Sequence, residues 1–329
     1  MTATVETTPT PTVPARHSRR KKPALSDRAR QDRNLGWRLA APAFVVMLIV
    51  VAYPIGYSIY LSLFNYRITD PHGRSFLGLR NYGTILSDTL WWHAVLVSTL
   101  VMLITVAVEF VLGMALAMVM NKIVIPRRTL RTIVLIPYSI ITVVSAYGWQ
   151  YAFAPNTGYL SRWLHEVSSW VPFGWWNFNA DYDWFGHHWS ALIAIMVSEV
   201  WKTTPFMSLL LLAGLAQVPG EMQEAAQVDG ATFWERLRKV TLPAMKAAIM
   251  VAVLFRALDA FRIFDNIFIM TQGSQDTTSV GVLAYNQTIT RSQVGLGSAI
   301  SVLLFVCVII ITTIFVKVFR TDLSRVRGD

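Results

Sequence analysis

Six long apolar segments limit what this chain of 329 residues can fold into. A helix needs about 20 mostly apolar residues to cross the hydrocarbon core of a bilayer. Only 15% of the residues are charged, whereas soluble domains carry roughly 25%. The sequence therefore predicts an all-α, polytopic membrane protein whose spans form one bundle within residues 38–320. The six expected spans are residues 39–64, 92–120, 133–153, 190–216, 244–270 and 296–316.

Lysine and arginine gather on one side of these spans, which predicts the orientation of the chain. Nine precede the first span, and others follow in alternate connections and after the last span, whereas the opposite side holds only five arginines. Residues 1–37 are expected to be a disordered basic terminus and residues 321–329 a tail, both cytoplasmic, with no cleavable signal peptide. The formal charge is +10. The basic residues lie mostly beside the spans, where they set the topology and attract anionic lipids, so nucleic-acid binding is not expected.

The polar segment 221–243 carries small residues at a distinctive spacing. Paired alanines allow another surface to approach a short helix over residues 223–228, and Gly230 suits the left-handed residue that commonly ends a helix. Thr232 can cap a second helix through Lys239, and Pro243 suits the first turn of the next apolar helix. The spacing predicts two short helices at a right angle, a knob for a partner's groove. The alternative is an amphipathic loop on lipid headgroups.

Ionisable and polar side chains inside three spans are costly in lipid and by default mark a water-filled path or a site. The fourth and fifth spans each carry four positions at the spacing i, i+3, i+4, i+7, which places them on one helical face. Charges, hydroxyls and aromatic rings together suit a polyhydroxylated ligand. The candidates are Tyr138 and Thr142; Glu199, Lys202, Thr203 and Phe206; and Asp259, Arg262, Ile263 and Asn266, with Arg256 and Asp265 beside them.

A structural interpretation of these charges stays open. Glu199 with Lys202, and Asp259 with Arg262, could form ion pairs that only hold helices together. Glu109 in the second span is expected to be a structural carboxylate that faces the bundle. In either case these groups would face a cavity or the bundle interior and not lipid.

The connection over residues 154–188 is rich in aromatic side chains. Two interpretations compete: an aromatic belt at the membrane interface, or a docking surface for an external partner. No zinc site is expected, because Ser169 stands where a metalloprotease motif would need its second histidine. The aromatic residues are Trp163, Trp170, Phe173, Trp175, Trp176, Phe178, Tyr182, Trp184 and Phe185.

The segment 221–243 resembles the EAA…G…I-x-L-P signature of the membrane subunits of ATP-binding-cassette (ABC) importers, with Val240 where the family usually has isoleucine. Residues 78–82 (GLRNY) and 258–273 resemble runs of carbohydrate-uptake permeases of the maltose and glycerol-phosphate type. Ser274 and Gln275 depart from the Gly-Pro that is usual there. The resemblance covers about residues 39–320.

This resemblance implies a six-helix type I importer transmembrane domain in the inner (plasma) membrane that works by alternating access. The implied partners are a second, homologous permease, two ATPase subunits that bind ATP and Mg, and an extracellular sugar-binding lipoprotein; no cofactor would bind to this chain. The implied ligand is a disaccharide such as trehalose, or alternatively another oligosaccharide or glycerol phosphate. The candidates of the third to fifth spans would line its path. The implied ATPase-coupling residues are Glu224, Ala225, Ala226, Asp229, Gly230, Leu242 and Pro243.

Sequence patterns of enzymes are absent. No glycine is followed by lysine, so the chain has no phosphate-binding loop, and it has no Gly-x-Ser-x-Gly elbow. We therefore expect a transport subunit whose ATP is hydrolysed by a separate protein. Two other classes are weaker hypotheses: a nucleotide-independent secondary transporter would not need the knob, and a membrane scaffold would not need polar stripes in three spans.

Overall fold

The computed structural model describes residues 27–122, 127–169, 179 and 181–326. Contacts group the chain into two units, Met1–Ile55 and Gly56–Asp329, and each is described by itself. In the first unit, helix α1 (Asp27–Met47) continues through the π-helical turn η1 (Leu48–Ala52) into the start of α2 (Tyr53–Ser62), most of which belongs to the second unit. The expectation of disorder up to residue 37 is therefore wrong for residues 27–37, which are helical.

In the second unit, α2 is followed by a β-hairpin, and the GLRNY run of residues 78–82 anchors this hairpin. Strands β1 (Phe64–Arg67) and β2 (Asp70–Phe76) pair antiparallel and lead to α3 (Arg80–Ser87). Gly78 turns the chain with a φ of 58°. Asn81 then donates from Nδ2 to the carbonyl oxygens of Ser62 and Phe64, at 2.8 and 3.1 Å. The run thus fastens the hairpin to the end of α2.

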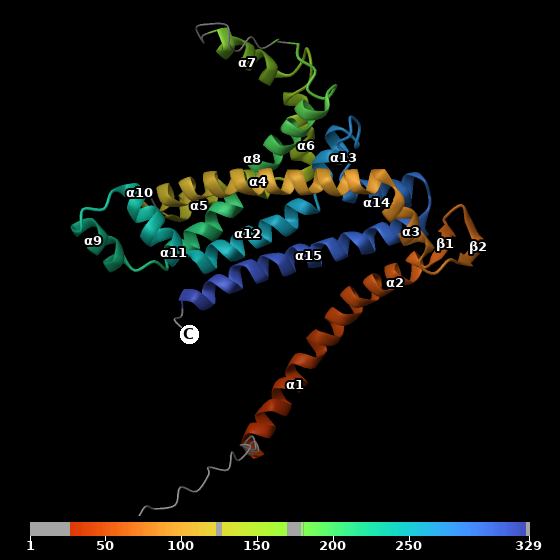
Figure 1. The fold of residues 1–329 in the computed structure, drawn as a ribbon, viewed down its shortest axis with the longest axis horizontal. Helices are drawn as coiled ribbons and strands as arrows, with labels where there is room; N and C mark the ends of the chain where they lie inside the picture. Colours follow the sequence, from red (N-terminus) through yellow and green to blue (C-terminus); the bar gives the residue numbers. More distant parts are fainter. Residues whose placement is uncertain (1–26, 123–126, 170–178, 180, 327–329) are drawn as a thin grey trace, which may run out of the picture. The chain divides into compact units, whose positions relative to one another are not determined.

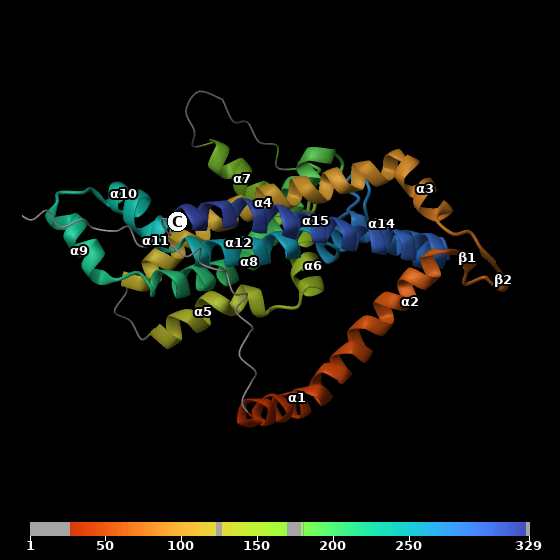
Figure 2. The same cartoon turned by 60° about the horizontal axis from the view of Figure 1, so that its bottom comes forward.

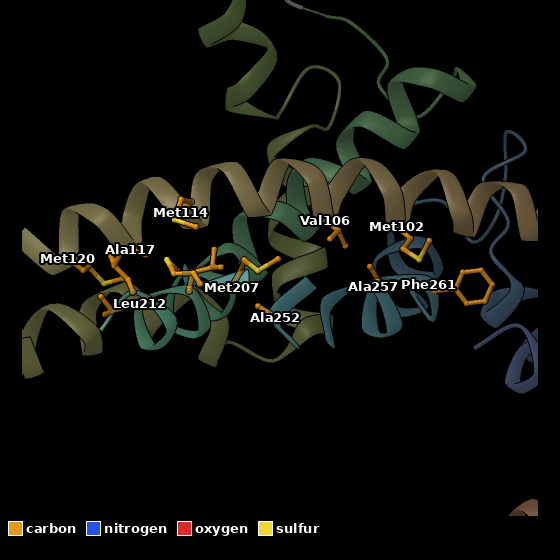
Figure 3. Close-up of a cluster of buried hydrophobic side chains, with 14 residues drawn as sticks. Met102, Val106, Met114, Ala117, Met120, Met207, Leu212, Ala252, Ala257 and Phe261 are labelled. Atoms are coloured by element: carbon orange, nitrogen blue, oxygen red, sulfur yellow. The ribbon is translucent and has the colours of Figure 1, made fainter. Parts of the chain in front are cut away.

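Long helices pack together in the second unit (Figures 1 and 2). Helix α4 (Thr89–Lys122) has its most extensive contact with α8 (His188–Leu215), and α12 (Lys246–Phe261) packs against α4, α8 and α15 (Val294–Val326). Glycines permit these close approaches: a Cβ on Gly113 would lie 2.9 Å from Met207 Cγ, and one on Gly214 would lie 2.5 Å from Ala248 Cβ. Figure 3 shows the resulting core, in which α4 side chains such as Met114 face those of α8 and α12.

Four of the six expected spans are continuous helices long and apolar enough to cross a membrane, over Leu35–Ser62, Thr89–Lys122, His188–Leu215 and Val294–Val318. The third is bent by 86° between Thr132–Ser139, in α5 (Arg127–Ser139), and α6 (Thr142–Ala152). The fifth is divided, because α12 ends at Phe261 and α13 covers Asp265–Met270. The prediction of one unbroken helix over residues 244–270 is therefore wrong.

A later residue stabilises the break in the fifth segment. Ser279 donates from Oγ to the carbonyl oxygen of Ile263 at 2.8 Å, and Ser279 Oγ itself accepts from the backbone N–H of Val282 at 3.3 Å. This satisfies a carbonyl that an unbroken helix would have paired with its own N–H groups. Ser279 caps α14 (Val280–Tyr285), which continues through η3 (Asn286–Thr290) to α15.

The aromatic segment over residues 154–188 contributes partly to internal packing. Trp184 is buried, donates from Nε1 to Ser161 Oγ at 2.8 Å, and meets Phe153 edge to face at 4.9 Å. Trp163, on α7 (Tyr159–Ser169), is exposed. The belt and the docking surface therefore both remain predictions for the exposed rings. Trp170, Phe173, Trp175, Trp176 and Phe178 lie outside the described residues.

Candidate functional site

A polar cavity of about 400 Å³ lies where the two helix breaks meet. Tyr138 is near the end of α5, Thr142 begins α6, and residues 262–264 form the break between α12 and α13. Backbone that leaves its helix can line a cavity in a membrane protein without facing lipid. The lining residues are Tyr138, Thr142, Glu199, Lys202, Thr203, Asp259, Arg262, Ile263, Phe264, Asp265 and Asn266.

The structure thus brings together the candidates that the sequence placed in three separate spans. Phe206 is the exception, because it does not line the cavity but lies behind its aromatic wall. Its ring stacks on that of Tyr138, with the centroids 5.0 Å apart and an interplanar angle of 11°. Lys202 Nζ lies 5.7 Å from the centroid of the Tyr138 ring, within the range of a cation–π contact. The wall therefore combines an apolar face with a cation.

A buried arginine joins the carboxylates of this region. Arg256 donates to Glu109 from Nε at 2.7 Å and from Nη2 at 3.0 Å, and from Nη2 to Glu199 at 3.1 Å. Its Nη1 also pairs with the carboxylate of Asp259. We call Arg256, Glu109, Glu199 and Asp259 the arginine hub. The hub ties α12 to α4 and α8.

These contacts correct the ion pairs that the sequence suggested. Among the described residues, neither Glu199 with Lys202 nor Asp259 with Arg262 is an ion pair; both carboxylates pair with Arg256 instead. Glu109 faces the bundle as expected and is 0% exposed. Sequence reasoning placed Arg256 only beside the candidate stripe. Its importance could have been inferred from its position within an apolar span, because an arginine there needs charged or polar partners.

An amide extends the hub to α13. Asn266 donates from Nδ2 to Glu199 Oε2 at 2.7 Å. Its own Oδ1 is buried and has no hydrogen-bond partner within the part of the chain that the structure describes. Thr203 Oγ1 lies 2.7 Å from Glu109 Oε1, and it also lies 2.6 Å from the carbonyl oxygen of Glu199. The cavity side of α8 is therefore organised by hydrogen bonds that span four helices.

The segment 221–243 has the predicted first helix, glycine turn and helix cap. Helix α9 (Gly220–Val228) contains the expected first helix, and Gly230 follows it with a φ of 77°. Thr232 caps α10 (Phe233–Arg236) in a reciprocal capping box with Glu235. The chain continues directly through η2 (Leu237–Thr241) to α11 (Leu242–Ala244), which contains Pro243. The prediction that Pro243 lies in the first turn of the next apolar helix is therefore wrong, because that helix, α12, begins at Lys246. The right angle between the two helices stays a prediction.

The surface of this segment is open. Glu224, Ala225, Asp229 and Gly230 are exposed, and Ala226 is half-buried. Two large apolar side chains also face outward: Val228 is 87% exposed and Trp234 68%. Figures 1 and 2 place α9 and α10 at one end of the helices of the second unit, opposite the β-hairpin. Such a surface fits a partner that approaches from that end.

The cap also sets the charge of its glutamate. The backbone N–H of Thr232 donates to Glu235 Oε2 at 2.9 Å, as does the hydroxyl of the same residue. Lys239 Nζ lies 3.6 Å from Oε1. These donors favour the carboxylate and hold the pKa of Glu235 below its usual range.

A permease fold with a polar cavity between its helices and a two-helix knob at one end defines a class of membrane transport subunits. Residues 109–325 match the family described as "Binding-protein-dependent transport system inner membrane component". The chain belongs to this family of ABC importer permeases. In such importers the ATPase is a separate subunit, so this chain is a transport subunit and not an enzyme.

Similar proteins cover most of the chain. The trehalose transport system permease protein SugA of Mycobacterium tuberculosis is 50% identical over 292 residues, which are 88% of this chain and 89% of that protein. The trehalose/maltose transport system permease protein MalF of Thermococcus litoralis is 36% identical over 296 residues, 89% of this chain and 96% of that protein.

A solved bacterial ABC transporter involved in alginate import has a similar fold. It superposes with a TM-score of 0.71 at 20% identity and covers 90% of this chain and 99% of its own. The likeness confirms the predicted importer transmembrane fold.

Proposed function

We propose that this chain moves a disaccharide such as trehalose into the cytoplasm as one permease of an ATP-driven importer. The observation that carries the proposal is the cavity, which combines hydroxyls, cations and carboxylates with the ring of Tyr138. Sugars offer hydroxyls for the polar groups and apolar ring faces for aromatic rings. The volume of about 400 Å³ lies within the usual range of small-molecule sites. The names of the two curated relatives support trehalose as the sugar.

The coupling mechanism we propose is alternating access. The knob formed by α9 and α10 would sit in a groove of an ATPase subunit, and its residues Glu224, Ala225, Ala226, Asp229 and Gly230 would transmit closure of the ATPases to the spans. Leu242 and Pro243 join the knob to the helix that carries the arginine hub. A second, homologous permease would complete the pathway, and an extracellular sugar-binding lipoprotein would deliver the ligand. ATP and Mg would bind only to the ATPases.

Transport by purified components tests the function. The chain, its partner permease, the ATPases and the binding protein are reconstituted in vesicles, and ATP-dependent uptake of labelled trehalose is measured. We expect uptake in the wild type and a clear loss in Lys202→Ala and Phe206→Ala, because both changes alter the aromatic wall. Val111→Ala is the matched control, since Val111 is an exposed side chain of α4. Normal uptake in both wall variants would remove the cavity from the path.

Topology is tested by thiol labelling. In a Cys307→Ser background, Tyr159→Cys in α7 should react with an impermeant reagent in intact cells. Val228→Cys in α9 should react only after lysis, because we place both termini and the knob in the cytoplasm. Both side chains are exposed in the structure. Labelling of residue 228 in intact cells would invert the proposed orientation.

A further inference from the structure

The hydrogen bonds of Glu199 leave this carboxylate little capacity for a ligand. One oxygen accepts from Arg256 Nη2 at 3.1 Å, and the other accepts from Asn266 Nδ2 at 2.7 Å. Both partners are themselves almost fully buried. Glu199 lines the cavity, yet each of its oxygens is already held by a donor of the protein. Its role is therefore to position its neighbours.

The carboxylate fixes the orientation of the Asn266 amide. An ionised carboxylate only accepts hydrogen bonds, so the group that faces Glu199 Oε2 must be the NH₂ and not the carbonyl oxygen. Asn266 is 1% exposed, and its Oδ1 has no partner in the structure. Buried polar atoms are normally hydrogen-bonded, and an exception calls for a missing partner. Asn266 is one of the residues that line the cavity, which makes a ligand held in the cavity the candidate for that partner.

The orientation is held by a chain of buried contacts. Glu109 receives two N–H groups of Arg256 and lies 2.7 Å from the hydroxyl oxygen of Thr203. Arg256 is thereby fixed, and it holds Glu199 in turn. The contacts run from α4 through α12 and α8 to the first turn of α13. A flip of the Asn266 amide would place its oxygen against the Glu199 carboxylate, which is unfavourable.

We propose that Asn266 Oδ1 is a specificity-determining acceptor for one hydroxyl of the translocated ligand, and that Glu109, Arg256 and Glu199 are positioning residues for it. The proposal rests on the proposed sugar transport. An acceptor with a fixed direction requires a donor at one position of the ligand. A hydroxyl satisfies it, whereas hydrogen, fluorine or a methyl ether at that position leaves Oδ1 buried and unpaired. The subsite therefore selects for a free hydroxyl at one carbon of the sugar.

Monodeoxy analogues of trehalose provide the test in the full reconstituted importer. Uptake of each analogue is measured at limiting concentration. The affinity of the binding protein for each analogue is measured separately, and the uptake rates are corrected for differences in this affinity. We expect one analogue to be transported at least about fivefold less well than trehalose by the wild type, as for loss of a partner to a buried acceptor. In Asn266→Ala this difference should vanish, while uptake of trehalose itself falls. Thr142→Val, another change in the cavity wall, should retain the discrimination.

Glu199→Gln tests the positioning role of Glu199. It also provides a second test of the proposal if the Asn266→Ala importer does not assemble. A glutamine side chain can donate or accept, so it allows the Asn266 amide to flip. We expect a raised KM for trehalose, weaker discrimination of the same analogue and a nearly unchanged maximal rate. The proposal would be overturned if uptake of that analogue, relative to trehalose, fell equally in the wild type, Asn266→Ala and Glu199→Gln. A water molecule, and not the ligand, would then be the hydrogen-bond donor to Asn266 Oδ1. Absence of trehalose uptake by the wild type would instead overturn the proposed function.

Discussion

Replacement of Arg256 by methionine should destabilise the protein severely. The side chain of Arg256 is 1% exposed and that of Glu109 is 0% exposed. The change removes both N–H groups that Arg256 donates to Glu109 and the one that it donates to Glu199. Among the described residues, Glu109 would keep only the Thr203 hydroxyl as a hydrogen-bond donor. Methionine fits the volume approximately, so the main effect is the buried charge that remains.

The expected magnitude follows from the uncompensated carboxylate. Removal of one partner of a buried ion pair costs about 3–5 kcal/mol, and replacement of the whole pair by apolar side chains is often nearly neutral. We therefore expect Arg256→Met to cost about 3–5 kcal/mol. The double variant Arg256→Met/Glu109→Met should recover more than half of that loss, because Glu199 retains Asn266 as a donor. Asp259→Asn should cost at most about 1 kcal/mol, since the Asp259 side chain is 59% exposed.

Reversible unfolding in mixed micelles measures these differences. The purified variants are titrated with SDS and followed by circular dichroism, with Val111→Ala as the control for a change on an exposed face. The double-mutant cycle isolates the Arg256–Glu109 coupling. If Arg256→Met lay within about 1 kcal/mol of the wild type, or if the double variant were less stable than Arg256→Met, the hub would not be the buried ion pair described above.

Three further predictions concern packing and the knob. Gly214→Val should destabilise the bundle by about 1–3 kcal/mol in the same assay, because a Cβ there would lie 2.5 Å from Ala248 Cβ; an unchanged midpoint would contradict this close approach. Thr232→Ala should speed hydrogen exchange over residues 233–241, since it removes the cap. In the wild type, the ionised Glu235 stabilises the helix start fully above the ordinary carboxyl pKa, and this stabilisation is lost as the pH falls through the lowered pKa of Glu235. Hydrogen exchange, corrected for its intrinsic pH dependence, should therefore rise only at acidic pH. Gly230→Asp should abolish substrate-stimulated ATP hydrolysis by the importer while the variant remains folded, and normal stimulation would argue against the knob as coupling element.

The knob was predictable because its geometry depends on near neighbours. Gly230 adopts a φ of 77° directly after α9, and Thr232 caps α10 three residues before its partner Glu235. Both features follow from what a residue type can do within one turn of chain. Patterns that depend only on neighbouring residues can therefore be read from the sequence without knowledge of the tertiary structure.

The helix breaks were not predictable from apolar periodicity. Apolar residues continue on both sides of the break, although Arg262 and Asp265 stand at it. The residue that stabilises the break, Ser279, lies 16 positions after Ile263. Hydropathy reports whether a segment prefers lipid, and it does not report whether a distant hydroxyl replaces a helical hydrogen bond. The candidate set survived this error because Asp259, Arg262 and Asn266 stay close to one cavity on either side of the break.

The ion pairs failed for a similar reason. Arg256 binds Glu109, which lies 147 positions away, and pairs with Asp259 only three positions away. Local spacing suggested Glu199 with Lys202 because these residues are near in sequence. An arginine inside a span must find carboxylates, but several candidates existed and only the packing of α4, α8 and α12 selects among them. The hub therefore marks the part of the site that tertiary structure decides.

The charges of the site distinguish between the possible ligands of this family. Glu199, Asp259 and Asp265 line the cavity together with the cations Lys202 and Arg262. The Arg256 guanidinium and the Glu109 carboxylate behind the wall cancel each other formally. Formal charge around the cavity is thus balanced to slightly negative, which disfavours an anion such as glycerol phosphate and favours a neutral polyhydroxylated sugar. The same balance explains why so many charged side chains can surround a neutral ligand that binds weakly. The charges of the hub hold the cavity wall in place, and the unpaired Asn266 oxygen offers the ligand a single directed hydrogen bond.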